Sequence, residues 1–260
     1  MTGDRGAEAR AAFVETHGAW DHDWDTVLEV DPDFVAAYAR MSRVPARGGH
    51  LSAKFRELVL LAVNAAATHL HLPAVDTHLR RALELGATAE EVVEVLELTA
   101  TLGIHAMNIG VPLLVEVLQE RGEWAEPAEL DDRRRQLRDE FTLRRGYWHP
   151  FWDQMLELAP DMFEAYTEFS GVPWRTGPLS PAEKELIYIS FDIAATHLFV
   201  PGTKLHIRNA LAHGATVQQV VEVMELASLL GVQSVTTTAP LLRQLLDEQH
   251  RPREESASPA

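Results

Sequence analysis

Two pairs of an acidic residue and a histidine stand out in the sequence, because both residue types can move protons. Glu57 is followed by His78, and Glu185 is followed by His206 at the same spacing. Imidazole titrates near neutral pH, and a nearby carboxylate can orient it or act as a base. The pattern predicts that His78 and His206 are catalytic, with Glu57 and Glu185 as partners. The alternative is that each glutamate is an exposed first-turn residue favoured by the helix dipole and each histidine is structural.

Further polar residues accompany each pair. His69 and His197 lie near the expected end of the helix that carries each glutamate, so they are either catalytic or cations favoured by the helix C-terminus. Arg47 and Arg175 follow a Val-Pro pair, and they could bind a substrate carboxylate or be solvated loop cations. The other predicted substrate-binding residues are His71, His105, Asn108 and Asp192.

A metal site in the first half of the chain is an alternative use of some of these side chains. The candidate ligands are three histidines and one carboxylate, namely His69, His71, His78 and Glu57. Phe199 replaces His71 in the second half of the chain, so at most one such site could exist. We predict no metal and no cofactor, with a metal-dependent enzyme as an alternative.

The chain repeats itself at an offset of 128 residues, which takes Glu57 to Glu185 and His78 to His206. Other matching positions are Trp20 with Trp148, Pro32-Asp33 with Pro160-Asp161, Tyr38 with Tyr166, Val44-Pro45 with Val172-Pro173, and Gly86-Ala87-Thr88 with Gly214-Ala215-Thr216. Self-similarity of this length indicates a duplication. We predict a first copy over residues 13–125, a charged helical linker over 126–146, a second copy over 147–250 and a disordered tail over 251–260.

The two copies differ at positions that could do chemistry. The first copy has His105 and Asn108 where the second has Gln233 and Thr236. This difference favours the first copy if only one copy is active.

Hydrophobic residues recur with a helical period throughout the chain, and no run alternates as a half-buried strand would. Thr88 with Glu91, and Thr216 with Gln219, are typical of capping boxes at helix starts. We therefore predict an all-α fold. The expected helices lie near residues 20–30, 33–43, 52–71, 75–85, 89–102, 106–120, 148–158, 161–170, 181–198, 203–213, 217–230 and 234–248.

Composition excludes several classes of function. The formal net charge of −16 argues against nucleic-acid binding, which needs a basic face. The chain has no cysteine, so disulfides, zinc-thiolate sites and thiol chemistry are excluded. No uninterrupted apolar run reaches the roughly 18 residues of a membrane helix, and no signal peptide is visible. We expect a cytoplasmic protein with no membrane partner.

The block that begins at Glu57 and runs through His78-Leu-Arg-Arg-Ala-Leu to Gly86-Ala-Thr-Ala-Glu-Glu-Val-Val resembles the core of the carboxymuconolactone decarboxylase family. That superfamily includes the alkylhydroperoxidase D-like proteins. The same pattern starts again at Glu185 and continues through His206 to Gly214. The resemblance implies two tandem alkylhydroperoxidase D-like helical domains that assemble as homo-oligomers, here as a trimer of pseudo-dimers. The peroxidase branch of the family uses a Cys-x-x-Cys pair, which this chain lacks, so a thiol peroxidase is excluded.

These observations together predict a cofactor-independent lyase of the decarboxylase type. Its substrate would be a small carboxylated or enolisable carbonyl compound, because the carbanion left by decarboxylation must be held as an enolate. A histidine would then return a proton to that carbanion. The alternative from another class is a non-catalytic protein of the same fold that binds a small ligand.

Overall fold

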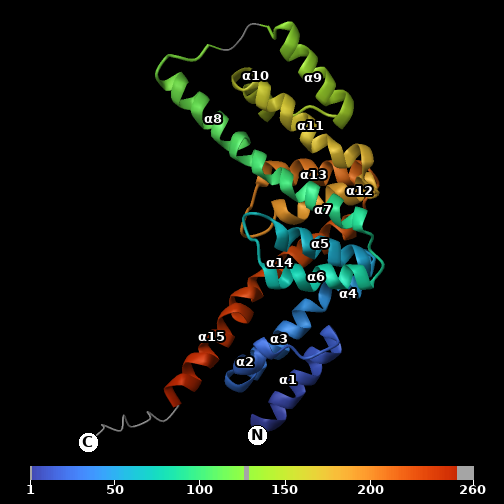
Figure 1. The fold of residues 1–260 in the computed structure, drawn as a ribbon, viewed down its shortest axis with the longest axis vertical. Helices are drawn as coiled ribbons and strands as arrows, with labels where there is room; N and C mark the ends of the chain where they lie inside the picture. Colours follow the sequence, from blue (N-terminus) through green and yellow to red (C-terminus); the bar gives the residue numbers. More distant parts are fainter. Residues whose placement is uncertain (1, 126–128, 251–260) are drawn as a thin grey trace, which may run out of the picture. The chain divides into compact units, whose positions relative to one another are not determined.

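A computed structural model describes residues 2–125 and 129–250, and every regular element in these ranges is a helix, as the sequence predicts (Figure 1). The predicted disordered tail lies outside the described residues. The first copy and the residues before it contain α1 (Thr2–His17), η1 (His22–Trp24), α2 (Asp25–Val30), α3 (Pro32–Ser42), α4 (Val44–Gly48), α5 (Ala53–Ala65), α6 (Leu72–Glu84), α7 (Ala89–Ala100), η2 (Thr101–Ile104) and α8 (His105–Glu120). The rest of the chain contains α9 (Asp132–Arg145), α10 (Phe151–Leu158), α11 (Pro160–Thr176), α12 (Pro181–Asp192), α13 (Val200–Ala212), α14 (Val217–Ser228), η3 (Leu229–Val232) and α15 (Gln233–His250).

The helices form two compact units that do not follow the repeat. One unit contains residues 1–50 and 228–260, and the larger unit contains residues 51–227. The larger unit therefore combines the second half of the first copy with most of the second copy. The residue boundaries assigned to the two copies from the sequence stay a prediction.

The core of the larger unit is built from both copies. Helix α5 packs against α6, α7 and α12, and α12 in turn packs against α7 and α13. Leu58 and Val59 on α5, and Ile187 and Ile189 on α12, are fully buried in one hydrophobic cluster. Since burial of apolar area is the dominant favourable term in folding, the two copies stabilise each other through this shared core.

Two buried ion pairs cross between the copies at equivalent places. Glu94 Oε1 lies 2.5 Å from Lys184 Nζ, and Glu222 Oε1 lies 2.5 Å from Arg56 Nε. The second oxygen of Glu94 accepts a hydrogen bond of 2.7 Å from the backbone N–H of Leu179. The offset of 128 takes Glu94 to Glu222, so one contact has been made twice by the duplication.

The helix that carries each glutamate is shorter than predicted. We expected helices over 52–71 and 181–198, but α5 ends at Ala65 and α12 ends at Asp192. The chain then turns through Leu70 and Leu198, which have positive φ angles of 47° and 51°. A left-handed residue reverses the chain direction and cannot continue a right-handed helix. The reversal lays α6 against α5 and α13 against α12.

Helix α9 confirms a helix in the segment between the copies, and it also contributes to a core. Leu137 and Phe141 on its inner face are buried with Trp152, Met155 and Phe163 of α10 and α11. Figure 1 shows α9 beside α10 and α11 in the larger unit, and α10 packs against α8. Most of the charged residues of the helix are exposed, while two apolar residues one turn apart anchor it.

In the smaller unit, Phe13 of α1 is buried with Trp24 and Val35 of the following helices. The offset of 128 takes Phe13 to Phe141, so α1 and α9 are equivalent helices. The repeat therefore extends back to α1 before the first copy and to α9 before the second.

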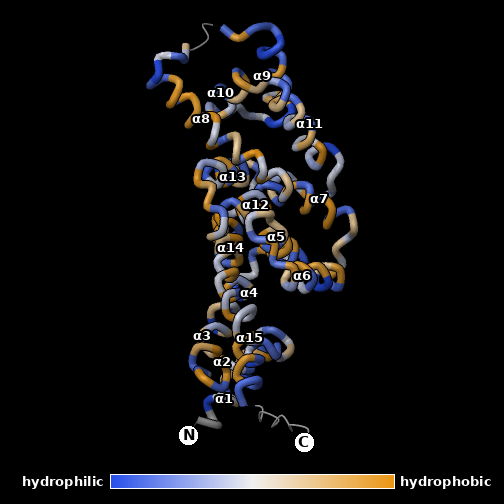
Figure 2. The backbone as a smooth tube through the Cα atoms, turned by 60° about the vertical axis from the view of Figure 1, so that its left-hand side comes forward, coloured by the Kyte–Doolittle hydropathy of each residue, from blue (hydrophilic) through white to orange (hydrophobic). Residues whose placement is uncertain are grey.

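Two helical stretches are long and apolar enough by length and composition to cross a membrane. They are Ala89–Glu120, of which half of the most apolar window is buried inside the protein, and Val217–His250. Figure 2 shows hydrophobic segments along α8, where Ile109, Leu113 and Leu114 are about half exposed. Core helices of globular proteins pass the same test, so the predicted absence of a membrane partner stays a prediction.

Candidate functional site

The structure brings each predicted glutamate and histidine into contact. His78 Nδ1 lies 2.7 Å from Glu57 Oε2, and His206 Nδ1 lies 2.6 Å from Glu185 Oε2. In both cases the ring N–H donates to the carboxylate, which fixes the ring orientation and leaves Nε2 free for chemistry. The contact exists because the chain reversal after α5 and α12 returns the next helix across the glutamate. The catalytic role of the four residues stays a prediction.

The pair in the second copy is more deeply embedded than its counterpart. The side chain of Glu185 is 2% exposed, compared with 15% for Glu57. Asn209 Nδ2 donates a second hydrogen bond of 3.2 Å to Glu185, and the Tyr188 ring stacks on His206 at 4.4 Å. These contacts hold His206 in one orientation.

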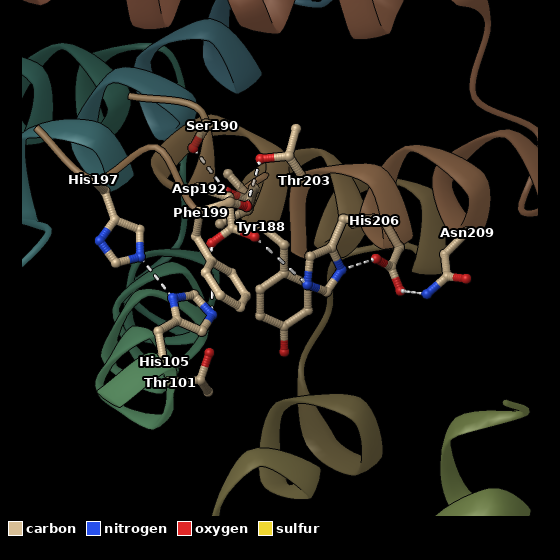
Figure 3. A network of polar contacts seen from close by, with 12 residues as sticks. Thr101, His105, Tyr188, Ser190, Asp192, His197, Phe199, Thr203, His206 and Asn209 are labelled. Carbon is tan, nitrogen blue, oxygen red and sulfur yellow. Dashed lines mark hydrogen bonds and ion pairs between the residues drawn. The ribbon is translucent and has the colours of Figure 1, made fainter. Parts of the chain in front are cut away.

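Asp192 lies two helical turns after Glu185, at the end of α12, and points toward two histidines (Figure 3). Its Oδ2 lies 4.0 Å from His206 Nε2, and its Oδ1 lies 3.8 Å from His105 Nε2. The carboxyl is fully buried, and neither oxygen has a hydrogen-bond partner among the described residues. Burial raises the pKa of Asp192 to about 7, against a smaller lowering effect of His206. A buried acid with such a pKa is typical of a functional site.

Gly202 on α13 makes the room that Asp192 occupies. A Cβ atom at this position would lie 2.3 Å from Asp192 Oδ2 and 2.5 Å from the Phe199 ring. The offset of 128 takes Gly202 to Ala74 and Asp192 to Asn64. The second copy alone thus combines a glycine at this position with the acid.

His105 and His197 complete the polar cluster. His105 Nδ1 lies 2.6 Å from His197 Nε2, and the His105 ring stacks on Phe199 at 3.8 Å. Burial, and then the charges of His197 and His206, lower the pKa of His105 to about 3, so this ring is neutral near pH 7. Burial also lowers the pKa of His197.

A cavity lies beside His206 and draws its walls from both copies. Its free space, including the part open to solvent, is about 480 Å³. The polar lining residues are Thr101, His105, Asn108, Arg145, Tyr147, Tyr166, Tyr188 and His206, and the apolar ones include Ile104, Phe141, Phe151, Phe199 and Leu205. His105 and Asn108 belong to the first copy, but α8 packs against α10 and carries them to the second-copy histidine, and their substrate-binding role stays a prediction.

Arg145 is the cation of this cavity. Its Nη2 donates a 3.0 Å hydrogen bond to the Ser170 carbonyl, and its guanidinium lies 5.2 Å from the centre of the Trp174 ring. Burial acts to lower the pKa of Arg145. The surrounding Tyr188, Tyr147 and Tyr166 together raise the pKa by more than burial lowers it, so the net shift is upward. The cavity therefore presents a fixed positive charge among phenol groups.

Several of these residues could not be found from motifs. Arg145 stands in a charged segment that reads as a linker, and Tyr147, Tyr166 and Tyr188 read as packing residues. The only signal was divergence between the copies, since the offset takes Arg145 to His17 and Tyr188 to Leu60.

Other predicted residues are not among those that line this cavity. Arg47 belongs to the other compact unit, and Arg175 is exposed near the end of α11. His69 and His71 stack on each other at 5.8 Å, and His71 Nδ1 accepts a hydrogen bond from the Ala74 N–H at the start of α6. Their binding or catalytic roles stay predictions.

The proposed first-copy metal site is not formed. Among the described residues, the one group of three or more potential ligands that comes together is His105, Asp192 and His197. His71 is used as a helix cap, and His78 is used by Glu57.

The arrangement can carry out acid–base chemistry on an anionic or polarised group. An oriented imidazole faces a cavity that also contains a guanidinium and several O–H donors. Donors of this kind stabilise negative charge that develops on an oxygen during a reaction.

Comparison with known proteins agrees with the fold and with the motif. The sequence model of the carboxymuconolactone decarboxylase family matches residues 32–109 and again residues 160–242. A crystal structure at 1.70 Å of a candidate gamma-carboxymuconolactone decarboxylase subunit from Burkholderia xenovorans LB400 is 50% identical, with a TM-score of 0.89. The match covers 94% of this chain and 98% of that chain. No curated protein matches the sequence. The chain belongs to the carboxymuconolactone decarboxylase family and contains two copies of its domain.

Proposed function

We propose that this protein is a cofactor-independent decarboxylase that acts on a small carboxylated, enolisable carbonyl compound in the cavity beside His206. The observation that carries the proposal is one cavity lined by both His206, oriented by Glu185, and the partly buried Arg145. The family, and the relative described as a gamma-carboxymuconolactone decarboxylase subunit, support the same reaction class.

The two groups would act at opposite ends of the reacting system. Loss of CO2 leaves an electron pair that is delocalised onto the carbonyl oxygen as an enolate. Arg145 and the phenols of Tyr147 and Tyr166 would stabilise this oxyanion, because charged and O–H donors act strongly in a site shielded from water. His206 would then donate its Nε2 proton to the carbon that lost CO2.

The carboxyl group that leaves would lie against the apolar part of the wall. Phe199 and Leu205 line the cavity near His206. A carboxylate in an apolar environment loses hydration, whereas neutral CO2 does not need it, so this placement favours departure.

The test compares matched histidine variants in the two copies. CO2 release from gamma-carboxymuconolactone is measured for wild type, His206→Gln and His78→Gln. We expect His206→Gln to lower kcat by about 10²–10⁴-fold, which is the usual contribution of a general acid. The expected loss for His78→Gln is smaller, because the first-copy pair has Leu60 and Asn64 where the second copy has Tyr188 and Asp192.

Two results would count against the proposal. Undiminished turnover in His206→Gln would show that this histidine does not supply the proton. Binding of the lactone and of related carboxylated carbonyl compounds without any CO2 release would instead support the non-catalytic binding protein.

A further inference from the structure

The proposed reaction consumes a proton in every turnover, since a carboxylate and one proton become CO2 and a new C–H bond. The proton that His206 donates must therefore be replaced from solvent. The His206 side chain is 13% exposed, and its Nδ1 is held by Glu185. Replacement must reach Nε2, the nitrogen that faces Asp192.

We propose that His197, His105 and Asp192 form a proton relay that recharges His206 from the protein surface. The chain of groups is continuous in Figure 3, from the partly exposed His197 inward. His197 and His105 are joined at 2.6 Å, His105 Nε2 lies 3.8 Å from Asp192, and Asp192 lies 4.0 Å from His206 Nε2. The inference rests on the proposed function, because only a reaction that consumes protons needs such a supply.

Each transfer is balanced by the next. His206 loses its Nε2 proton to the substrate carbon, and Asp192 then passes a carboxyl proton from Oδ2 to Nε2. Asp192 regains a proton at Oδ1 from His105 Nε2, while His105 Nδ1 takes one from His197 Nε2. His197 is reprotonated by water or buffer, so one solvent proton enters for each CO2 released. His105 then carries its proton at Nδ1, and exchange with water in the cavity that it lines restores the Nε2–H form before the next turnover.

The two longer gaps suit a relay that moves in steps. Contacts of 3.8 and 4.0 Å are too long for direct hydrogen bonds, but a small rotation of the carboxyl group or one bridging water closes a gap of this size. Both carboxyl oxygens lack a hydrogen-bond partner among the described residues, so each is available to one histidine. Asp192 ionises near neutral pH because it is buried, and it can therefore both hold and release a proton.

The repeat keeps His69 as the counterpart of His197 but replaces the other two parts of this relay. Asn64 occupies the place of Asp192, and its Nδ2 donates a 2.7 Å hydrogen bond to the Leu60 carbonyl on its own helix. An amide does not exchange protons near neutral pH as a carboxyl group does. The offset of 128 likewise takes His105, which lines the second-copy cavity, to Gln233. His206 therefore has a relay, whereas its counterpart His78 does not.

A bound divalent cation is the competing use of the same three side chains. Their potential ligand atoms lie within 4.8 Å of one another. The 2.6 Å separation of the two imidazole nitrogens matches a shared proton and is too short for two ligands of one metal ion, whose bonds to nitrogen are about 2.0–2.1 Å long. The geometry thus favours the relay.

The main test is the variant His197→Gln, because His197 does not line the cavity. Turnover of gamma-carboxymuconolactone is measured at low buffer concentration. We expect kcat to fall by about tenfold or more with KM unchanged, and the solvent deuterium isotope effect on kcat to rise. Added imidazole buffer should restore most of kcat, because a small acid can replace the missing surface histidine. The control is His250→Gln, which removes an exposed histidine outside the network.

Unchanged kcat in His197→Gln, or a loss that buffer does not rescue, would overturn the relay while leaving the decarboxylase proposal intact. A lowered affinity for the lactone would assign His197 to binding instead. Metal analysis belongs to the same series: stoichiometric metal in the purified wild type, lost together with activity in His197→Gln, would replace the relay with a metal site.

A second measurement does not depend on turnover. In protein labelled with ¹⁵N-histidine, exchange of the His206 ring N–H with solvent is followed by NMR for wild type, His105→Phe and His250→Gln. We expect His105→Phe to slow this exchange by about tenfold or more, and His250→Gln to leave it unchanged. Equal exchange in all three proteins would contradict the relay. If the lactone is not decarboxylated at all, this experiment still decides the relay separately from the proposed function.

Discussion

At the scale of single residues, one difference between the copies is a buried acid that only the second copy has at the end of its glutamate helix. Asp192 and Asn64 occupy equivalent positions near the end of equivalent helices. Asn64 satisfies its amide on its own helix, whereas a carboxylate cannot donate to the equivalent carbonyl of Tyr188. Burying an unpaired carboxyl group costs free energy, and an asparagine of the same shape would fit at this position. The presence of the acid therefore indicates a functional role.

We predict that Asp192→Asn stabilises the protein in a pH-dependent way. The folded pKa of Asp192 is about 7, above its ordinary value of 3.8, so its contribution to stability is greatest below pH 3.8 and is lost as the pH rises through 7. At pH 8 the wild type therefore contains the full cost of a buried carboxylate, and the variant does not. We expect the variant to be more stable by about 2–4 kcal/mol at pH 8, converging on the wild type toward pH 4.

Urea unfolding at the two pH values measures this difference. The matched control is Asp139→Asn, an exposed acid on α9, which should change stability equally little at both. A variant that is no more stable than wild type at pH 8 would show that the carboxylate is paired. The same variant should lose the relay, so that stability and turnover change in opposite directions.

Sequence reasoning found the acid–histidine pairs because their types, spacing and duplication were all visible. Asp192 is predicted from the sequence to bind substrate, and that role stays a prediction: the cavity lining contains its neighbours His105 and His206 but not Asp192 itself. Arg145 was missed because nothing in its local sequence distinguishes a buried cation from a solvated one.

At the scale of elements, the two glutamate helices and α9 differ from the sequence prediction for different reasons. The glutamate helices end six residues early, because apolar composition alone does not reveal a left-handed residue such as Leu70 or Leu198. Helix α9 is highly charged, yet Leu137 and Phe141 are enough to anchor it. A helix with two buried positions in four turns has too weak a hydrophobic pattern to be distinguished from a solvated one.

We predict that Phe141 is essential for docking α9. Its side chain is 1% exposed and lies 5.5 Å, between ring centres, from both Trp152 and Phe163. Phe141→Ala should lower the free energy of unfolding by about 3–5 kcal/mol, because it leaves a cavity in a packed aromatic cluster. Leu143→Ala on the same helix should change it by less than about 0.5 kcal/mol, since Leu143 is 87% exposed.

Denaturant unfolding of the two variants provides the comparison. Similar losses for both would mean that α9 is held by its charged residues. Phe141 also lines the cavity, so the variant should lose turnover as well as stability, while Leu143→Ala should keep both.

At the scale of the whole molecule, the two copies are not two independent domains in the usual sense. Helices α5 and α12, one from each copy, pack in a common core, and ion pairs such as Glu94 with Lys184 join the copies again. An unpaired buried charge is expensive, so separating the copies would expose apolar surface and also leave these ions without partners.

We predict that neither half of the chain folds alone. Fragments separated within residues 126–128 should each be largely unfolded or aggregated, whereas their mixture should regain the helical content of the intact protein. Circular dichroism and size-exclusion chromatography of the fragments, alone and mixed, measure this. Cooperative unfolding of either fragment by itself would contradict the shared core. The intact chain is the reference for both measurements.

The sequence by itself determined the all-helical fold, the duplication, the family and the two acid–histidine pairs, because helical periodicity and residue spacing are local or repeated along the chain. The tertiary structure alone decided which residues meet in one cavity. His105, Arg145 and His206 come from three distant segments, and contact between them depends on helix packing rather than on spacing. It also decided that the pocket belongs to the second-copy histidine, because the last helix of the first copy packs on the helices that begin the second.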